Sequence, residues 1–175
     1  MKTHIGIDPG KNGGIAIISE TNTIVYKIPL IGKVIDLQEL NKIFKSVKGE
    51  NPHAVLEDVH SIHGVPATTN FVLGECRGNL LMALVIYDIP FTLVQPKAWQ
   101  KEMFQGVPEM YKTTSKKKDD EVIKKNKVDT KAMALVACKR IFPEVDLRAT
   151  EKSKVAHDGI VDALLMAEYC RRHFK

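Results

Sequence analysis

The chain has 175 residues, of which 44% are hydrophobic and 27% are charged. These are ordinary values for a globular protein, so they exclude a disordered or fibrous class, and the length suits one domain with one core. The formal net charge of +5 favours a polyanionic partner such as nucleic acid, although charge alone does not establish one.

The cysteines and the apolar runs limit the setting of the protein. Cys76, Cys138 and Cys170 are far apart in the sequence and form no Cys-x-x-Cys pair, which argues against a disulfide framework and against a zinc site. The longest apolar run, residues 80–86, is too short to span a bilayer, and the sequence opens on a strand pattern instead of a signal peptide. We therefore expect a protein of the reducing cytoplasm, that of a host cell if the protein is viral, without membrane contact.

The first half of the chain predicts four strands and a helix. Three short apolar runs separated by turn residues indicate an antiparallel meander. Apolar residues at helical spacing after Asp36 predict a helix, and the strand that follows it should run parallel to the first strand, because a crossover connection joins them. The expected strands are residues 4–8, 14–19, 24–28 and 53–57.

The second half predicts one more strand and four helices. The long helix carries Gly74 and Gly78 on one face, so another backbone can approach it, either in the core or at a subunit interface. The lysine-rich segment at about 110–127 is expected to be a loop. The predicted strand is 91–94, and the helices are 68–87, a short one opened by Pro96, about 129–141 and about 155–173. The whole chain, 1–175, is thus predicted to be a single α/β domain with a five-stranded mixed sheet and helices on both faces.

Four acidic residues hold positions that need a compensating partner. Asp8 ends the first strand and Glu57 ends its expected parallel neighbour, so the two should lie close together. Asp158 and Asp162 are four residues apart and share one face of the last helix. Each acid taken singly also has a structural interpretation, such as a turn cap for Asp8 or a complement of the helix dipole for Asp158. An acid in an apolar stretch is nevertheless costly unless a cation or a hydrogen-bond network receives it.

Taken together, the four acids predict a metal site. Carboxylates gathered in one pocket raise each other's pKa or attract divalent cations, and hard oxygen ligands favour magnesium or manganese. Two such ions activate a water molecule and stabilise the leaving oxygen during attack at phosphorus. We therefore predict Asp8, Glu57, Asp158 and Asp162 as catalytic and metal-binding residues, with Mg²⁺ or Mn²⁺, two ions in each site, as cofactors.

The stretches that carry these acids also resemble a known family. The segments IGIDPG (5–10), AVLE (54–57) and DGIVDAL (158–164) look like the three acidic motifs of RuvC-type Holliday junction resolvases in the RNase H-like superfamily, closest to the phage and poxvirus branch. The resemblance implies an RNase H-like fold and a homodimer that binds branched DNA. It also implies the activity of a crossover junction endodeoxyribonuclease in DNA recombination and repair, which resolves four-way junctions by paired nicks.

One motif departs from the family pattern. Bacterial RuvC usually spaces its last two metal-binding positions by three residues, whereas Asp158 and Asp162 are four apart and Gly159 occupies the position three before Asp162. We assign the metal-binding role to Asp158 because helix geometry accepts either spacing. His157 is a further candidate for metal binding or proton transfer.

Several basic or aromatic residues are candidates for DNA contacts. Lys11 lies in the turn beside Asp8, and His60 lies in the loop after Glu57, where the family often has a stacking aromatic residue. The lysines of the 110–127 segment should lie beside the active-site face and contact phosphates without reading bases, although a solvated charged loop is the alternative. The candidates are Lys11, His60, Lys97, Lys116, Lys117 and Lys118. Trp99, the single tryptophan, is expected to be a packing anchor.

Three other functions stay open at the level of sequence. A nuclease of the same fold could act on flaps, replication forks or structured RNA. The Asp-x-Gly turn also opens sugar-kinase and actin-like ATP-binding proteins, although those enclose ATP between two such domains. A junction-binding protein without catalytic activity is the last alternative, and it would ordinarily have lost some of the four acids.

Overall fold

A computed structural model describes residues 2–61, 63–118 and 121–174, with residues 115–118 and 121–125 described by their backbone only. Its centre is a five-stranded sheet with the order β3-β2-β1-β6-β7. The strands are β1 (Thr3–Asp8), β2 (Gly14–Ile18), β3 (Thr23–Lys27), β6 (Pro52–Glu57) and β7 (Phe91–Val94). The antiparallel β1-β2-β3 meander and the parallel pairing of β6 with β1 confirm the predicted topology.

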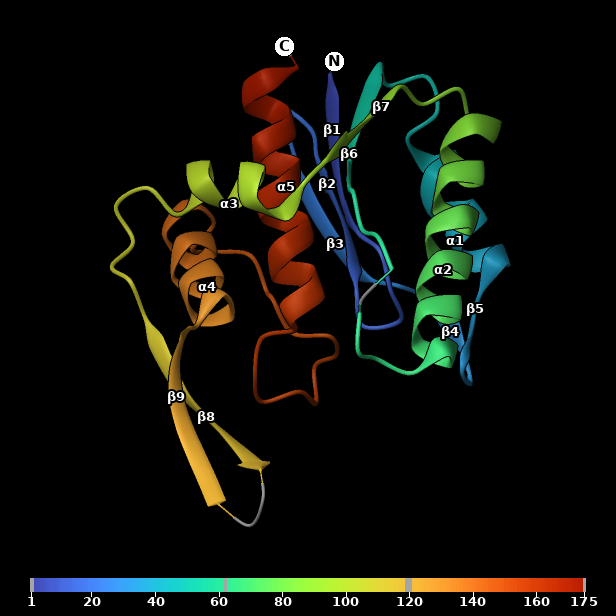
Figure 1. Cartoon of the computed structure of the whole chain (residues 1–175). Coiled ribbons are helices and arrows are strands. Elements are labelled where there is room, and N and C mark those ends of the chain that lie inside the picture. The colour runs from blue at the N-terminus through green and yellow to red at the C-terminus, as the bar shows by residue number, and fades with distance from the viewer. Residues whose placement is uncertain (1, 62, 119–120, 175) are drawn as a thin grey trace.

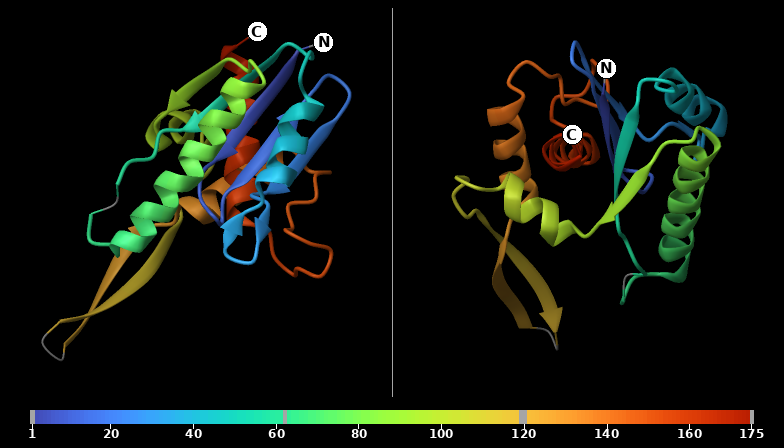
Figure 2. Two further views of the ribbon diagram at one scale, coloured as in Figure 1. Left: turned by 90° about the vertical axis from the view of Figure 1, so that its right-hand side faces the viewer. Right: turned by 90° about the horizontal axis from the view of Figure 1, so that it is seen from above.

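Helices cover both faces of this sheet, as predicted (Figure 1 and Figure 2). The helices are α1 (Leu37–Ser46), α2 (Ala67–Ile86), α3 (Pro96–Met103), α4 (Thr130–Ile141) and α5 (Asp158–His173). One core lies between the sheet and α1 with α2, where Ile5 and Ile7 of β1 are fully buried. A second core lies on the opposite face around α5, with Val55 and Trp99. Because side chains alternate along a strand, β1 contributes Gly6 to this second face.

Glycines allow α5 to approach the sheet backbone closely. A Cβ atom at Gly6 would lie 2.1 Å from the carbonyl oxygen of Ala163, and one at Gly14 would lie 2.4 Å from that of Gly159. Any larger residue at these positions would force the helix away from β1 and β2. The close packing fixes the first turn of α5 beside the turn between β1 and β2.

The lysine-rich segment differs from the prediction, because it forms a β-hairpin instead of a loop. Strand β8 (Tyr111–Lys118) pairs antiparallel with β9 (Glu121–Val128), and the hairpin extends away from the sheet (Figure 1). Its lysines obscured the strand signal, although Thr113, Thr114, Val122 and Ile123 are residues with high strand propensity. The two strands pair through backbone hydrogen bonds, which do not depend on apolar side chains. The lysine-rich composition therefore led to the wrong prediction of a loop.

Two smaller differences concern short elements. A two-residue pair of strands, β4 (Leu30–Ile31) and β5 (Val34–Ile35), turns at Gly32, whose φ of 62° favours glycine. Helix α5 begins at Asp158, later than the expected residue 155, because His157 caps it: the Nδ1 atom accepts a hydrogen bond from the Ile160 backbone N–H at 3.3 Å. In the described part of the chain, no helix combines the length and apolar character needed to cross a bilayer.

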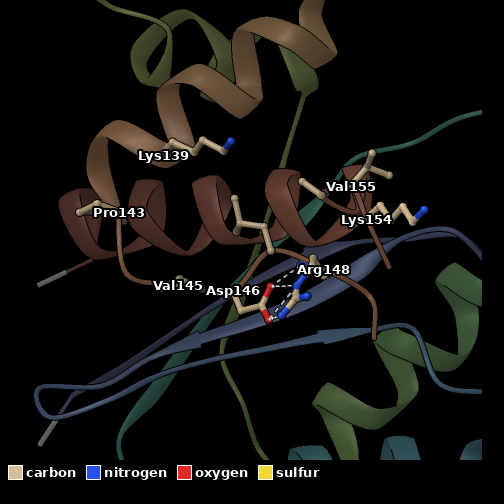
Figure 3. A pocket seen from close by; sticks show the side chains of 9 residues that line it. Lys139, Pro143, Val145, Asp146, Arg148, Lys154 and Val155 are labelled. Carbon is tan, nitrogen blue, oxygen red and sulfur yellow. Dashed lines mark hydrogen bonds and ion pairs between the residues drawn. The ribbon is translucent and has the colours of Figure 1, made fainter. Parts of the chain in front are cut away.

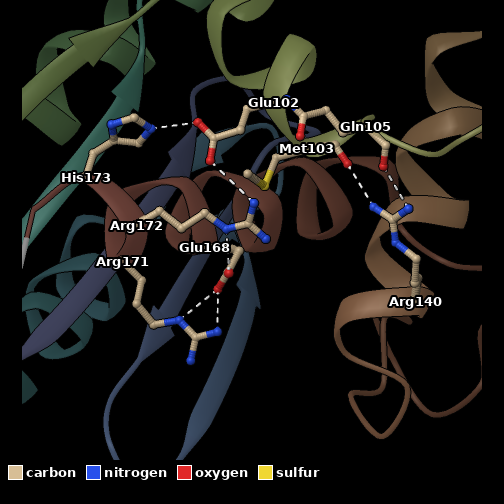
Figure 4. A network of polar contacts seen from close by, with 8 residues as sticks. All are labelled: Glu102, Met103, Gln105, Arg140, Glu168, Arg171, Arg172 and His173. Carbon is tan, nitrogen blue, oxygen red and sulfur yellow. Dashed lines mark hydrogen bonds and ion pairs between the residues drawn. The ribbon is translucent and has the colours of Figure 1, made fainter.

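Polar contacts attach α3 to α4 and α5 (Figure 4). Glu102 of α3 accepts a hydrogen bond from Arg172 at 3.4 Å and lies 2.6 Å from His173. Arg140 of α4 donates to the carbonyl oxygens of Met103 and Gln105. Helix α3 therefore has a fixed position against the other two helices, and the side chains that it directs toward the sheet are fixed with it.

Candidate active site

The four predicted acids meet at one edge of the sheet. Asp8 is the last residue of β1 and Glu57 the last of β6, and the register that pairs Ile7 with Leu56 brings the two strand ends together. Asp158 and Asp162 lie in the first two turns of α5 and line, with Asp8, a cavity of about 590 Å³. Glu57 does not line this cavity, but its charge acts on both Asp8 and Asp162.

Asp8 and Asp162 are partly buried carboxylates without a donor. Neither accepts a hydrogen bond from any residue in the described parts of the chain. Burial, followed by the charge of Glu57, raises the pKa of Asp8 well above its usual value. Burial, followed by the charges of Glu57 and Asp158, raises the pKa of Asp162 to about 7. A cation placed between these groups would stabilise the ionised carboxylates, and so offset both the cost of burial and the repulsion between the charges.

Glu57 accepts a hydrogen bond from one residue in the described parts of the chain. The indole Nε1–H of Trp99, on α3, donates a hydrogen bond to Glu57 Oε1 at 3.0 Å. Burial raises the pKa of Glu57, and the bond from Trp99 acts in the opposite direction. Trp99 is completely buried, as its predicted role of packing anchor requires, but no pattern in the sequence pointed to its bond with a site residue.

Lys131 is a site residue that the sequence did not indicate. It lies in the first turn of α4, lines the cavity, and places its Nζ atom 2.5 Å from Asp158 Oδ2. This bond is the main cause of the raised pKa of Lys131, and the charges of Asp162 and Asp8 add to it. Nothing distinguished Lys131 among 26 basic residues, because only the packing of α4 beside α5 brings it to the acids.

The donor set suits a divalent cation, although the side chains do not form a finished metal site. Within the residues described, no three His, Cys, Asp or Glu side chains stand close enough to hold an ion as they are. Two carboxylates without donors and with raised pKa values indicate uncompensated negative charge, which hard cations such as Mg²⁺ or Mn²⁺ accept through oxygen ligands. An ion bound here would take over from the Lys131 ammonium group as the counter-charge of Asp158.

The unusual spacing of the last two acids has a steric reason. A Cβ atom at Gly159 would lie 2.2 Å from the carbonyl oxygen of Asn12 and 2.5 Å from the Cα atom of Gly13. The position three before Asp162 therefore cannot carry a carboxylate in this packing. His157 also lines the cavity, where its Nδ1 atom is engaged in capping α5 and burial lowers its pKa.

The predicted DNA-contacting residues lie at different places in the structure. Lys11 lines a second cavity, of about 470 Å³, together with Thr68 and Thr69 at the start of α2. His60 is exposed, with its Nε2 atom 3.5 Å from Asp58, and Lys97 is exposed on α3. The side chains of Lys116, Lys117 and Lys118 lie outside the described residues.

A basic cavity, whose lining residues are drawn in Figure 3, adjoins the acidic one. It measures about 510 Å³, lies between α4 and the segment before α5, and shares Val155 and Ala156 with the acidic cavity. Arg148 at its wall is paired with Asp146, whereas Lys139 and Lys154 form no ion pair with any described residue. The sequence prediction included neither lysine, because Lys139 lies in the last turn of α4 and Lys154 in the irregular segment before α5, and neither position carries a pattern that points to a cavity.

The sheet order and its helices define the RNase H-like class of fold, which confirms the predicted fold class. No protein-family model and no curated protein matches the sequence. Among solved structures, RuvC of T. thermophilus in complex with a Holliday junction substrate is similar, with a TM-score of 0.53 and 14% identity over 99% of this chain and 97% of that chain. A second Thermus thermophilus RuvC structure has a TM-score of 0.51 and 14% identity, covering 97% and 96%. The chain therefore has a RuvC-type fold.

Proposed function

We propose that this protein is a metal-dependent, structure-selective DNA endonuclease that resolves four-way junctions by paired nicks. The observation that carries the proposal is a pair of partly buried carboxylates, Asp8 and Asp162, to which no described residue donates a hydrogen bond. Glu57 and Asp158 lie near this pair at the same edge of a RuvC-type sheet. The placement in the phage and poxvirus branch stays a prediction from the motifs.

The site suits hydrolysis of a phosphodiester. Asp8, Glu57, Asp158 and Asp162 would hold Mg²⁺ or Mn²⁺, and two such ions supply an activated water and stabilise the leaving oxygen. Lys131 keeps a positive charge beside the carboxylates, where it can attract a phosphate group once a metal ion replaces it at Asp158. The acidic cavity by itself would repel DNA, so cations at its rim are also required.

Basic residues on two sides of the acidic cavity support DNA as the substrate. Lys11 stands on the side of α2, while Lys139 and Lys154 of the basic cavity stand on the side of α4. Lysines at these positions can contact phosphates of one duplex arm without reading its bases. The T. thermophilus protein of similar fold is described with a Holliday junction substrate, and we extend this substrate class to the present chain.

Paired nicks require two active sites, and α2 offers a surface for a second copy of the chain. The α2 stripe, which we define as Phe71, Gly74, Gly78, Met82 and Val85, lies along one face of the helix. The three large side chains of the stripe are more than half exposed, and a Cβ atom at either glycine would meet no atom within 4 Å. Such a stripe lets two helices pack closely, so we propose a homodimer formed through α2.

Cleavage of a synthetic four-way junction tests the function. We expect symmetric nicks with Mg²⁺ or Mn²⁺, no nicks with EDTA, and loss of cleavage in Asp8→Asn and Glu57→Gln with junction binding retained. Glu20→Gln, in the exposed turn between β2 and β3, is the matched control and should cleave normally.

The same assay separates the alternatives. Replication forks, flaps and a structured RNA should be cut much less than the junction, and preferential cutting of any of them would assign the chain to that substrate instead. Undiminished junction cleavage by Asp8→Asn would contradict the proposed site. Junction binding without any cleavage by the unmodified protein would leave only a binding protein.

A further inference from the structure

The contact between Trp99 and Glu57 joins the hydrophobic core to the acidic site. The indole N–H of Trp99 lies 3.0 Å from Glu57 Oε1, and no other described residue donates a hydrogen bond to this carboxylate. One oxygen of Glu57 is therefore held, and the second has no donor. A carboxylate in this condition can bind a cation through its second oxygen without losing its existing bond.

Trp99 has no freedom to move away from Glu57. Its side chain is fully buried, and Phe104 packs edge-on against it with ring centroids 6.0 Å apart. The helix that carries it is tied to α5 through Glu102 and to α4 through Arg140 (Figure 4). The indole is thus part of the rigid frame of the molecule.

The hydrogen bond should also persist when the site is filled. If Glu57 turned away completely, the Trp99 N–H would be left in the core without an acceptor among the described residues, and a buried donor without an acceptor destabilises the fold. Glu57 is thereby restricted to side-chain positions that keep Oε1 at the indole. Such outer hydrogen bonds orient the carboxylates that bind metal ions in other proteins.

We propose that Trp99 is a positioning residue, which orients Glu57 for metal binding at the site of the proposed nuclease. The inference rests on the proposed function, but it concerns the metal and one side chain only. It gives the single tryptophan of the chain a second role besides packing. It also makes this tryptophan a spectroscopic reporter, because a cation bound at Glu57 changes the electric field at the hydrogen-bonded indole.

Metal binding without DNA tests the inference. Calorimetric titration with Mn²⁺ or Ca²⁺ should show an affinity about 10-fold or more lower in Trp99→Phe, which keeps an aromatic ring but has no N–H. Phe104→Leu is the matched control, because it alters packing around Trp99 without touching Glu57, and its metal affinity should match that of the unmodified protein. Thermal unfolding of both variants separates a loss of the metal site from a loss of the fold.

Tryptophan emission gives an independent measurement on the unmodified protein. Addition of Mn²⁺ or Ca²⁺ should change the emission, and Glu57→Gln should abolish this change while remaining folded. Equal metal affinity of Trp99→Phe and the unmodified protein would overturn the inference, and so would emission that does not respond to either ion. Because these measurements contain no nucleic acid, they succeed or fail separately from the cleavage assay that tests the proposed function.

Discussion

The acidic site should make the metal-free protein less stable as the pH rises. The pKa of Asp162 is about 7 in the folded protein against 3.8 for an ordinary aspartate, so the folded state binds a proton that the unfolded state releases. The contribution of Asp162 to the free energy of unfolding is fully present below pH 3.8 and is progressively lost between pH 3.8 and about 7. The difference between these values, at about 1.4 kcal/mol for each pH unit, gives a loss of about 4 kcal/mol at pH 8.

Asp162→Asn removes this titration while preserving the shape of the side chain. In EDTA at pH 8 we expect the variant to be more stable than the unmodified protein by about 2 kcal/mol, because the partly buried amide offsets part of the gain. At pH 4, where Asp162 is protonated and the gain is absent, the cost of the buried amide should leave the variant less stable than the unmodified protein by about 2 kcal/mol. Urea unfolding followed by circular dichroism at pH 4, 6 and 8 measures the difference.

Asp146→Asn is the control for the effect of charge alone. Asp146 is exposed, and its bonds from Arg148 lower its pKa to about 2, so replacing it should slightly destabilise the protein at every pH above that value. The reasoning is refuted if Asp162→Asn is no more stable than the unmodified protein at pH 8. It is also refuted if Asp162→Asn and the unmodified protein lose equal amounts of stability between pH 4 and pH 8.

Three further predictions concern packing, charge and assembly. Gly159→Ala should lower the free energy of unfolding by about 3 kcal/mol, because its Cβ would lie 2.2 Å from the carbonyl oxygen of Asn12; unchanged urea unfolding would contradict the close approach of α5. Lys131→Met should strengthen Ca²⁺ binding several-fold in calorimetry, because no ammonium group then competes for Asp158, and weaker binding would show that Lys131 supports the site. Phe71→Glu, in the α2 stripe, should convert the proposed dimer to a monomer in analytical ultracentrifugation, and an unchanged sedimentation profile would exclude this interface.

Local patterns in the sequence determined the sheet and the choice of the four acids. The strand ending at Asp8 and the strand ending at Glu57 were recognisable because apolar runs stop there, and the crossover helix required their parallel pairing. The four-residue spacing of Asp158 and Asp162 placed them on one face of α5. These conclusions depend on periodicity and connection rules, which act over short stretches of chain.

The tertiary structure alone decided what surrounds those acids. Lys131 and Trp99 reach the site from α4 and α3, and neither position carries a local pattern that points there. The reason that Gly159 cannot be an acid is a contact with the turn at Asn12, nearly 150 residues earlier in the chain. Contacts between distant segments depend on how helices pack, and packing is set by side-chain shapes summed over the whole core. The sequence by itself therefore determined which carboxylates meet, and the packing decided their partners.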